Sequence, residues 1–101
     1  MHKAKAGDKK TQEGWQGFKN LCMVLNELPN TQEFFDLFFT AKEREDLASR
    51  YLIVQGLLKN DMNQRDMAEK LDVSIAKITR GSNELKDCSP EIIAFIQKHG
   101  N

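Results

Sequence analysis

Proline, glycine and cysteine are scarce in this chain, and no long apolar run occurs. With 2 prolines and 6 glycines among 101 residues, little interrupts helix formation, and the abundant Leu, Lys, Glu and Gln favour helix over sheet. No apolar stretch approaches the length of a membrane span, and none follows the lysine-rich start, so we expect neither a membrane protein nor a signal peptide. Cys22 and Cys88 lack metal-ligand spacing, and a reduced, cytoplasmic protein is the simplest interpretation.

The chain also lacks net charge and the residue patterns of catalysis. Its 15 Lys and Arg residues balance 15 Asp and Glu residues, which counts against a constitutive, tight DNA binder. Both histidines, His2 and His99, are terminal, and the chain shows no phosphate-binding glycine loop and no Cys–His constellation. We therefore expect no enzyme, no metal site and no cofactor.

The spacing of apolar residues predicts an all-α protein without internal repeats. We expect a disordered N-terminal arm over residues 1–10 and one helical domain over residues 11–101. A Thr40-x-x-Glu43 capping box should open a long helix. Outside the window described below, the main expected helices cover about residues 11–28, 40–59 and 91–99.

Two apolar surfaces stand out on these helices. The segment 34–39, Phe-Phe-Asp-Leu-Phe-Phe, is aromatic on all sides, so it needs burial on more than one side and suggests a partner chain. On the long helix, Leu47, Tyr51, Val54 and Leu58 form the principal apolar stripe.

The window from Gln64 to Asn83 has the pattern of a helix-turn-helix. Asp72 tolerates the left-handed conformation of a tight corner, and Ser74 is a good N-cap for a second helix. Ile75 and Ile78 can share the inward face of that helix, whose outward residues are small, polar or basic, as contact with the major groove requires. The alternative is an ordinary helical hairpin in a core. Five basic against four acidic residues between positions 62 and 86 mean that useful DNA affinity needs a dimer, a ligand or both.

Residues 40–85 closely resemble the bacterial tryptophan repressor family, and weaker identity extends the resemblance over most of the chain. The most specific matches are Glu43-Arg44-Glu45, the Arg50-centred helix, Gln64-Arg65 and the Ile-Thr-Arg-Gly-Ser-Asn string at 78–83. The resemblance implies an intertwined homodimer of six-helix subunits, with L-tryptophan as corepressor and operator DNA of tryptophan biosynthesis or transport genes as target. The Trp repressor is itself a standard example of helix-turn-helix docking.

The resemblance also implies which residues hold tryptophan. Arg50 and Arg80 match the arginines that sandwich the indole, and Arg80 can also address the carboxylate. Thr40 matches a residue near the carboxylate, and Leu37 and Phe39 match positions whose backbone carbonyls face the ammonium. The alternatives are a surface charge for Arg50 and a phosphate contact for Arg80.

Gly81 and Glu84 complete this implied set. Gly81 leaves room beside the indole ring. Glu84 lies one turn after Arg80, at a family position that is usually small and close to the ligand amine. It can accept a bond from the ammonium, or pair with Arg80 and compete for it. Ala41 stands where a proline often follows the capping threonine.

On the DNA side, the resemblance implies contacts from both helices of the motif. Gln64 and Arg65 open the first helix, where the arginine can address guanine. Lys77 replaces a neutral residue and Ala68 a basic one, so phosphate contacts are rearranged relative to well-known members. The implied contacts of the second helix are Ile75, Ala76, Lys77 and Thr79.

The expected mechanism is a ligand-gated shift in conformation, in which tryptophan wedges between the long helix and the reading helix. Two alternatives remain. A DNA-binding protein of this scaffold without a tryptophan site is favoured by Glu84, and tryptophan calorimetry distinguishes it. A small helical interaction module using residues 34–39 is favoured by the balanced charge, and absence of salt-sensitive DNA binding would support it.

Overall fold

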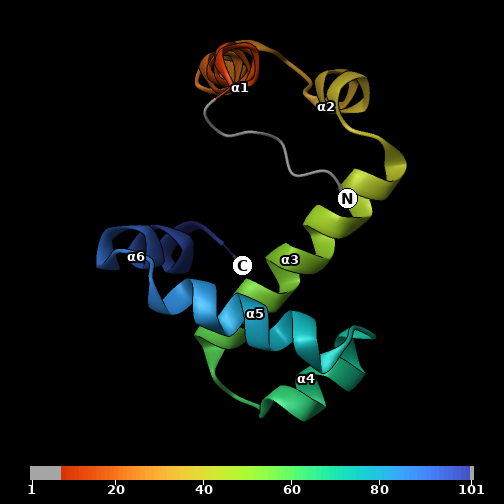
Figure 1. The fold of residues 1–101 in the computed structure, drawn as a ribbon, viewed down its shortest axis with the longest axis vertical. Helices are drawn as coiled ribbons and strands as arrows, with labels where there is room; N and C mark the ends of the chain where they lie inside the picture. Colours follow the sequence, from red (N-terminus) through yellow and green to blue (C-terminus); the bar gives the residue numbers. More distant parts are fainter. Residues whose placement is uncertain (1–7, 101) are drawn as a thin grey trace. The chain divides into compact units, whose positions relative to one another are not determined.

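The computed structural model describes residues 8–100, and every regular element in that range is helical (Figure 1). Six α-helices and one short 3₁₀ turn, η1, occur there, which confirms the predicted all-α fold. None of these helices combines the length and apolar character needed to cross a bilayer. The elements are α1 (Lys9–Cys22), η1 (Leu25–Glu27), α2 (Gln32–Phe38), α3 (Ala41–Lys59), α4 (Gln64–Leu71), α5 (Ile75–Lys86) and α6 (Pro90–His99).

The chain forms two compact units, divided between Phe38 and Phe39. The single domain expected over residues 11–101 stays a prediction. Helices α1 and α2 belong to the first unit, and α3 to α6 belong to the second. Most of the predicted disordered arm, residues 1–7, lies outside the described residues. The last part of that arm is helical, because the Asp8 side chain caps α1 by accepting a hydrogen bond from the backbone N–H of Thr11 at 3.0 Å.

Helix α1 is shorter than the predicted helix over residues 11–28. It ends at Cys22, and the turn η1 follows. Between them the β-branched Val24 leaves the helical region, with φ −118° and ψ 20°. The helical pattern of apolar residues therefore continues past the end of the helix itself.

Aromatic side chains hold the first unit together. The ring of Phe18 in α1 lies 5.9 Å from that of Phe34 and 5.3 Å from that of Phe38, both in α2, and Trp15 stacks on Phe18 at 5.9 Å. No residue of α1, η1 or α2 is buried, and Trp15 and Leu37 are 58% and 76% exposed. The burial that the sequence predicts for segment 34–39 is thus not reached within these elements.

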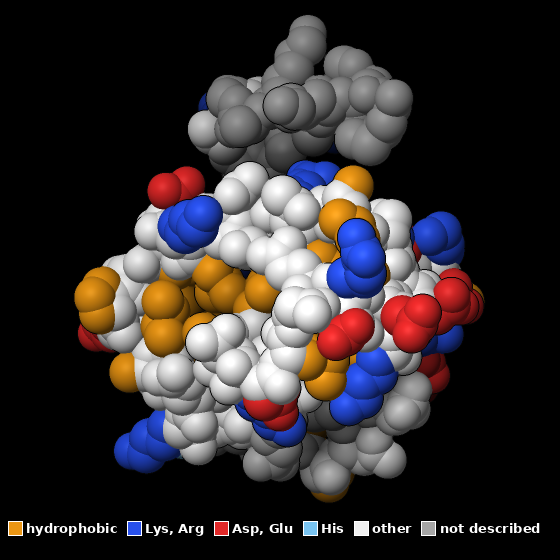
Figure 2. Space-filling view, turned by 90° about the horizontal axis from the view of Figure 1, so that it is seen from below, with side chains coloured by type: hydrophobic (Ala, Val, Ile, Leu, Met, Phe, Trp, Pro, Cys, Tyr) orange, Lys and Arg blue, Asp and Glu red, His pale blue; other side chains and the backbone are white. Residues whose placement is uncertain are grey.

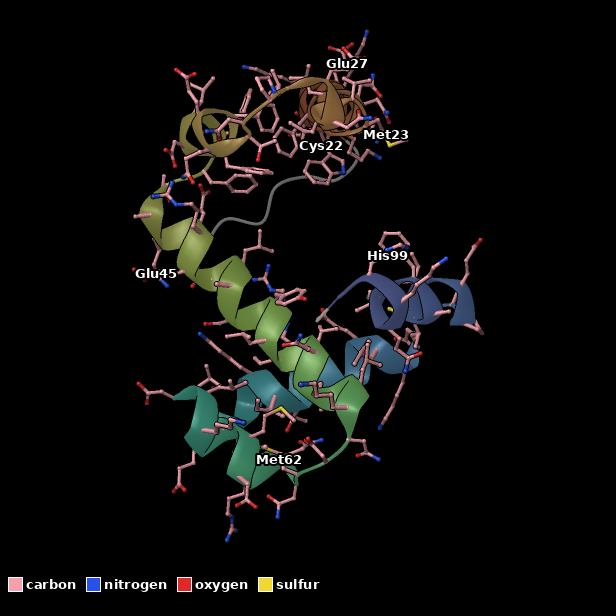
Figure 3. The ribbon with its side chains drawn as sticks, turned by 180° about the vertical axis from the view of Figure 1, so that it is seen from behind. Cys22, Met23, Glu27, Glu45, Met62 and His99 are labelled. Carbon is pink, nitrogen blue, oxygen red and sulfur yellow. The ribbon has the colours of Figure 1, made fainter. Side chains whose placement is uncertain are left out.

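The second unit has a small core to which α3, α4 and α5 each contribute. Its four buried residues are Ile53, Met67, Ala68 and Ile78. Partly buried residues from α3, α4 and the two loops beside α4 surround them: Leu57, Met62, Leu71 and Val73 (Met62 is labelled in Figure 3).

The predicted stripe on α3 is not the face that enters this core. Within the chain, Leu47 and Tyr51 of the stripe are 49% and 45% exposed, and the buried residue of α3 is Ile53. The helix is apolar on more than one side, so a periodic pattern alone did not identify which side faces α4 and α5.

Both ends of α3 are fixed by local sequence. The backbone N–H of Glu43 donates to the Thr40 hydroxyl at 3.1 Å, and the backbone N–H of Thr40 donates to the Glu43 carboxylate at 2.9 Å. The predicted capping box is therefore confirmed. At the other end, Asn60 adopts the left-handed conformation with φ 54° and stops the helix.

Candidate functional site

The corner between α4 and α5 has the geometry that the sequence predicts for a helix-turn-helix. Asp72 adopts the left-handed conformation with φ 55° and ψ 49°, and its N–H donates to backbone carbonyls at the end of α4. The Ser74 side chain caps α5 by accepting a hydrogen bond from the N–H of Lys77 at 3.2 Å. Ile78 of α5 is fully buried. These features fix the angle at which α5 leaves α4.

The structure leaves the predicted DNA-contacting side chains accessible. Gln64 is half-buried at the start of α4, and its side-chain oxygen accepts a bond from the Thr79 hydroxyl at 3.4 Å, which links the two helices. Acidic and basic side chains lie close together on the face shown in Figure 2. The exposed predicted contacts are Arg65, Ile75, Ala76, Lys77 and Thr79.

A pocket of about 640 Å³ lies between α3 and α5, and one residue of α6 also lines it. Its apolar floor comes from Ile53 and Val54 of α3, Leu85 of α5 and Ile96 of α6. The volume lies in the range of small-molecule sites, ~300–1,000 Å³. Its remaining walls are mainly polar or charged, formed by Lys42, Asp46, Ser49, Arg50, Lys77, Arg80, Gly81, Glu84 and Cys88.

Gly81 sets how closely α5 approaches α3 beside this pocket. A Cβ atom at Gly81 would lie 2.9 Å from Cγ2 of Ile53, closer than such contacts allow. Ile53 is itself 4% exposed and belongs to the core. The family resemblance implies that Gly81 leaves room beside an indole, and the structure adds that Gly81 lets α5 pack onto α3.

Positive charge predominates around the pocket, because four basic side chains face two acidic ones. Lys42 donates to Asp46 at 2.7 Å, one turn apart on α3. This hydrogen bond raises the pKa of Lys42 and lowers the pKa of Asp46, which Lys77 and Arg50 also help to lower by their charge. On α5, Arg80 Nε lies 3.7 Å from a carboxylate oxygen of Glu84.

Four of the predicted tryptophan-site residues meet in this pocket, namely Arg50, Arg80, Gly81 and Glu84. Helix α3 supplies the first and α5 the other three, and each lies on the side of its helix that faces the other helix. The predicted DNA contact Lys77 also lines the pocket, one turn before Arg80.

The remaining three predicted ligand residues do not line the pocket in this chain. The Thr40 hydroxyl accepts the capping bond from Glu43, and the Phe39 carbonyl accepts a bond from the Arg44 guanidinium at 2.9 Å. Leu37 lies in the last turn of α2, which belongs to the other unit. The ligand contacts of Thr40, Leu37 and Phe39 therefore stay predictions.

Several residues that line the pocket were not predicted, although helical spacing could have identified some of them. Asp46 lies four residues before Arg50, and Ile53 and Val54 lie three and four residues after it, so all share one face of α3. Cys88 lies four residues after Glu84, just beyond α5. His99 lies outside the pocket and packs on Phe95, with ring centroids 4.9 Å apart (Figure 3).

Comparison with known proteins gives consistent matches. The family described as Trp repressor protein matches residues 13–100. A Trp operon repressor homolog of Chlamydia trachomatis serovar D is 48% identical over 87 residues, covering 86% of this chain and 93% of the relative. The Chlamydia caviae homolog is 46% identical, covering 89% and 93%. A homolog from Haemophilus influenzae strain PittEE is 36% identical and covers 86% of each chain.

Proposed function

The chain belongs to the Trp repressor family, whose members are DNA-binding transcriptional regulators and not enzymes, and we propose that L-tryptophan controls its binding to operator DNA. The proposed targets are genes of tryptophan biosynthesis or transport. One observation carries the proposal: the pocket lies between α3 and the reading helix α5, so whatever fills it contacts the helix that meets DNA. As an operator-binding repressor, the protein would act in the cytoplasm.

The chemistry of the pocket suits a zwitterionic indole amino acid. The guanidinium groups of Arg50 and Arg80 can bind a carboxylate and lie against the faces of an aromatic ring. Ile53 and Val54 offer apolar contact for the indole. The predominance of basic side chains favours a ligand that carries a carboxylate.

Helix α5 joins ligand binding to DNA binding because both sets of residues lie along it. Arg80, Gly81 and Glu84 face the pocket, whereas Ile75, Ala76 and Thr79 occupy the proposed DNA-contacting positions. A ligand that bridges α3 and α5 favours one spacing of the two helices. By linkage, it strengthens operator binding only as far as it prefers the DNA-competent spacing.

We also propose that the working form is an intertwined homodimer. The exposed apolar side chains of the first unit, with Leu37 at 76% exposure, and of α3, with Leu47 at 49%, offer a surface that a second copy would cover. A two-fold dimer presents two copies of α5, one to each half of a pseudo-palindromic operator. The DNA affinity gained from binding two half-sites would offset the weak affinity that results from the low net charge of one motif.

The proposed function is tested by measuring the binding of a tryptophan-operon promoter fragment from the source organism, with and without millimolar L-tryptophan. The amino acid should strengthen binding at least fivefold, within the usual range of allosteric coupling, ~5–150-fold. An affinity that stays constant across the titration would rule out tryptophan control.

Two arginine variants distinguish tryptophan binding from operator binding. Arg80→Ala should weaken L-tryptophan binding about tenfold or more in calorimetry, because a charge-assisted contact is lost. Arg65→Ala, at an exposed position of α4, should leave tryptophan binding unchanged and weaken operator binding. The opposite pattern would exchange their assigned roles and contradict the proposed site.

A further inference from the structure

The Arg80–Glu84 pair places a positive and a negative charge on the same wall of the pocket. The two side chains lie one helical turn apart on α5, with Arg80 Nε 3.7 Å from Glu84, and both line the pocket. They remain 80% and 64% exposed. Exposed pairs of this kind are weak, so each partner can exchange its contact for another charge at little cost.

We propose that this pair exchanges partners when the ligand enters: the ligand carboxylate takes Arg80, and Glu84 receives the ligand ammonium. Glu84 would then select ligands that carry both charges and discriminate against indole acids without an amine. This inference rests on the proposed tryptophan site, and it gives the site a specificity determinant.

Glu84 is better placed for the ammonium than Asp46, the other acidic residue of the pocket. Asp46 already binds Lys42 at 2.7 Å. The longer Arg80–Glu84 separation of 3.7 Å leaves Glu84 the more available acceptor. An ammonium at Asp46 would have to displace a short, charge-assisted hydrogen bond, which costs more than displacing a weak pair.

The exchange predicts that a ligand with only one of the two charged groups of the zwitterion binds less tightly, for a different reason in each case. An indole carboxylate without an ammonium takes Arg80 from Glu84 and leaves an uncompensated negative charge beside its own carboxylate. An indole amine without a carboxylate must share Glu84 with Arg80. Only the amino acid satisfies both charged groups, so discrimination arises from unfavourable states of the wrong ligands as well as from favourable contacts with the right one.

The test is calorimetry with L-tryptophan, indole-3-propionate and tryptamine on the wild-type chain, Glu84→Gln and Glu69→Gln. The wild-type protein should bind L-tryptophan about tenfold or more tightly than either analogue. In Glu84→Gln the preference over indole-3-propionate should fall about tenfold. Glu69→Gln removes the same charge from an exposed position of α4 outside the pocket and should keep the wild-type preference.

Three results would overturn the inference. A wild-type chain that binds indole-3-propionate as tightly as L-tryptophan refutes it without any variant. A preference that survives Glu84→Gln, or falls in Asp46→Asn instead, removes Glu84 as the acceptor but leaves the proposed function intact. Absence of tryptophan binding to the wild-type chain refutes the proposed function and this inference together.

Discussion

Gly81 is the residue at which the pocket meets the core. It lines the pocket, and the position of its missing Cβ lies against Ile53 of the buried cluster. A change at this position therefore acts on packing and on the ligand site at once, whereas Arg80 and Glu84 on the same helix are largely exposed. Neighbouring residues of α5 thus have different physical roles.

The variant Gly81→Ala should destabilise the fold. A Cβ 2.9 Å from Cγ2 of Ile53 forces α5 or Ile53 to move, and overpacking of this kind costs about 1–3 kcal/mol. The higher helix propensity of alanine returns up to about 1 kcal/mol. Urea unfolding should show a net loss, together with weaker tryptophan binding as α5 moves from α3.

Gly17→Ala provides the matched control for that experiment. Nothing lies within 4 Å of a Cβ built at Gly17 in α1. The propensity gain of up to about 1 kcal/mol should therefore appear without a packing cost. If Gly81→Ala stabilised the protein as Gly17→Ala does, the close approach of α5 to α3 would not be a real constraint.

At the scale of helices, the sequence predicted features that depend on a few neighbouring residues. The capping box of Thr40 and Glu43, the left-handed Asp72 and the Ser74 cap all form as expected. Each depends on hydrogen bonds across two to four residues, so local residue types are sufficient to identify it. The resemblance to a known family supplied the four predicted residues that meet in the pocket.

The apolar pattern of α3 did not identify the rest of the pocket, because that pattern does not show how α3 turns about its axis. Helix α3 is apolar on more than one side, and the side bearing Ile53, rather than Leu47 and Tyr51, faces α5. That choice follows from packing across the unit, which periodicity does not encode. Helical spacing from Arg50 places Asp46 on this face, whereas Ser49 and Cys88 were recognised as pocket residues only from the structure.

The cap of α3 offers a test at the same scale. Thr40→Ala removes the hydroxyl that accepts from the N–H of Glu43 at 3.1 Å, and the loss of such a cap costs about 1 kcal/mol. Urea unfolding measures this cost, and Thr40→Ser should retain most of the wild-type stability because it keeps the hydroxyl. Equal losses in the two variants would show that the methyl group matters and not the cap.

At the scale of the whole molecule, the small core and the exposed aromatic unit both favour a second copy. Four of the described residues are buried, while Trp15, Leu37 and Phe38 remain exposed in the first unit. A single chain of this length buries little surface, and association of two copies would enlarge the apolar interior.

Light scattering should therefore give twice the chain mass of 11.6 kDa at micromolar concentration. Leu37→Glu should shift the protein towards the monomer, because a charge would be buried in the proposed interface. Leu37 is 76% exposed in the single chain, so the change costs a monomer little packing. A wild-type monomer mass, or a Leu37→Glu protein that stays dimeric, would contradict the corresponding step of this proposal.

The central claim is that one coupling free energy links the tryptophan pocket to the DNA-reading helix, and a closed thermodynamic cycle tests it most directly. The cycle compares operator affinity with and without saturating L-tryptophan, and tryptophan affinity with and without saturating operator. Linkage requires the two enhancement factors to be equal, and we predict a common value of at least about fivefold. An enhancement factor of one for both operator affinity and tryptophan affinity would mean that the pocket and the reading helix act independently.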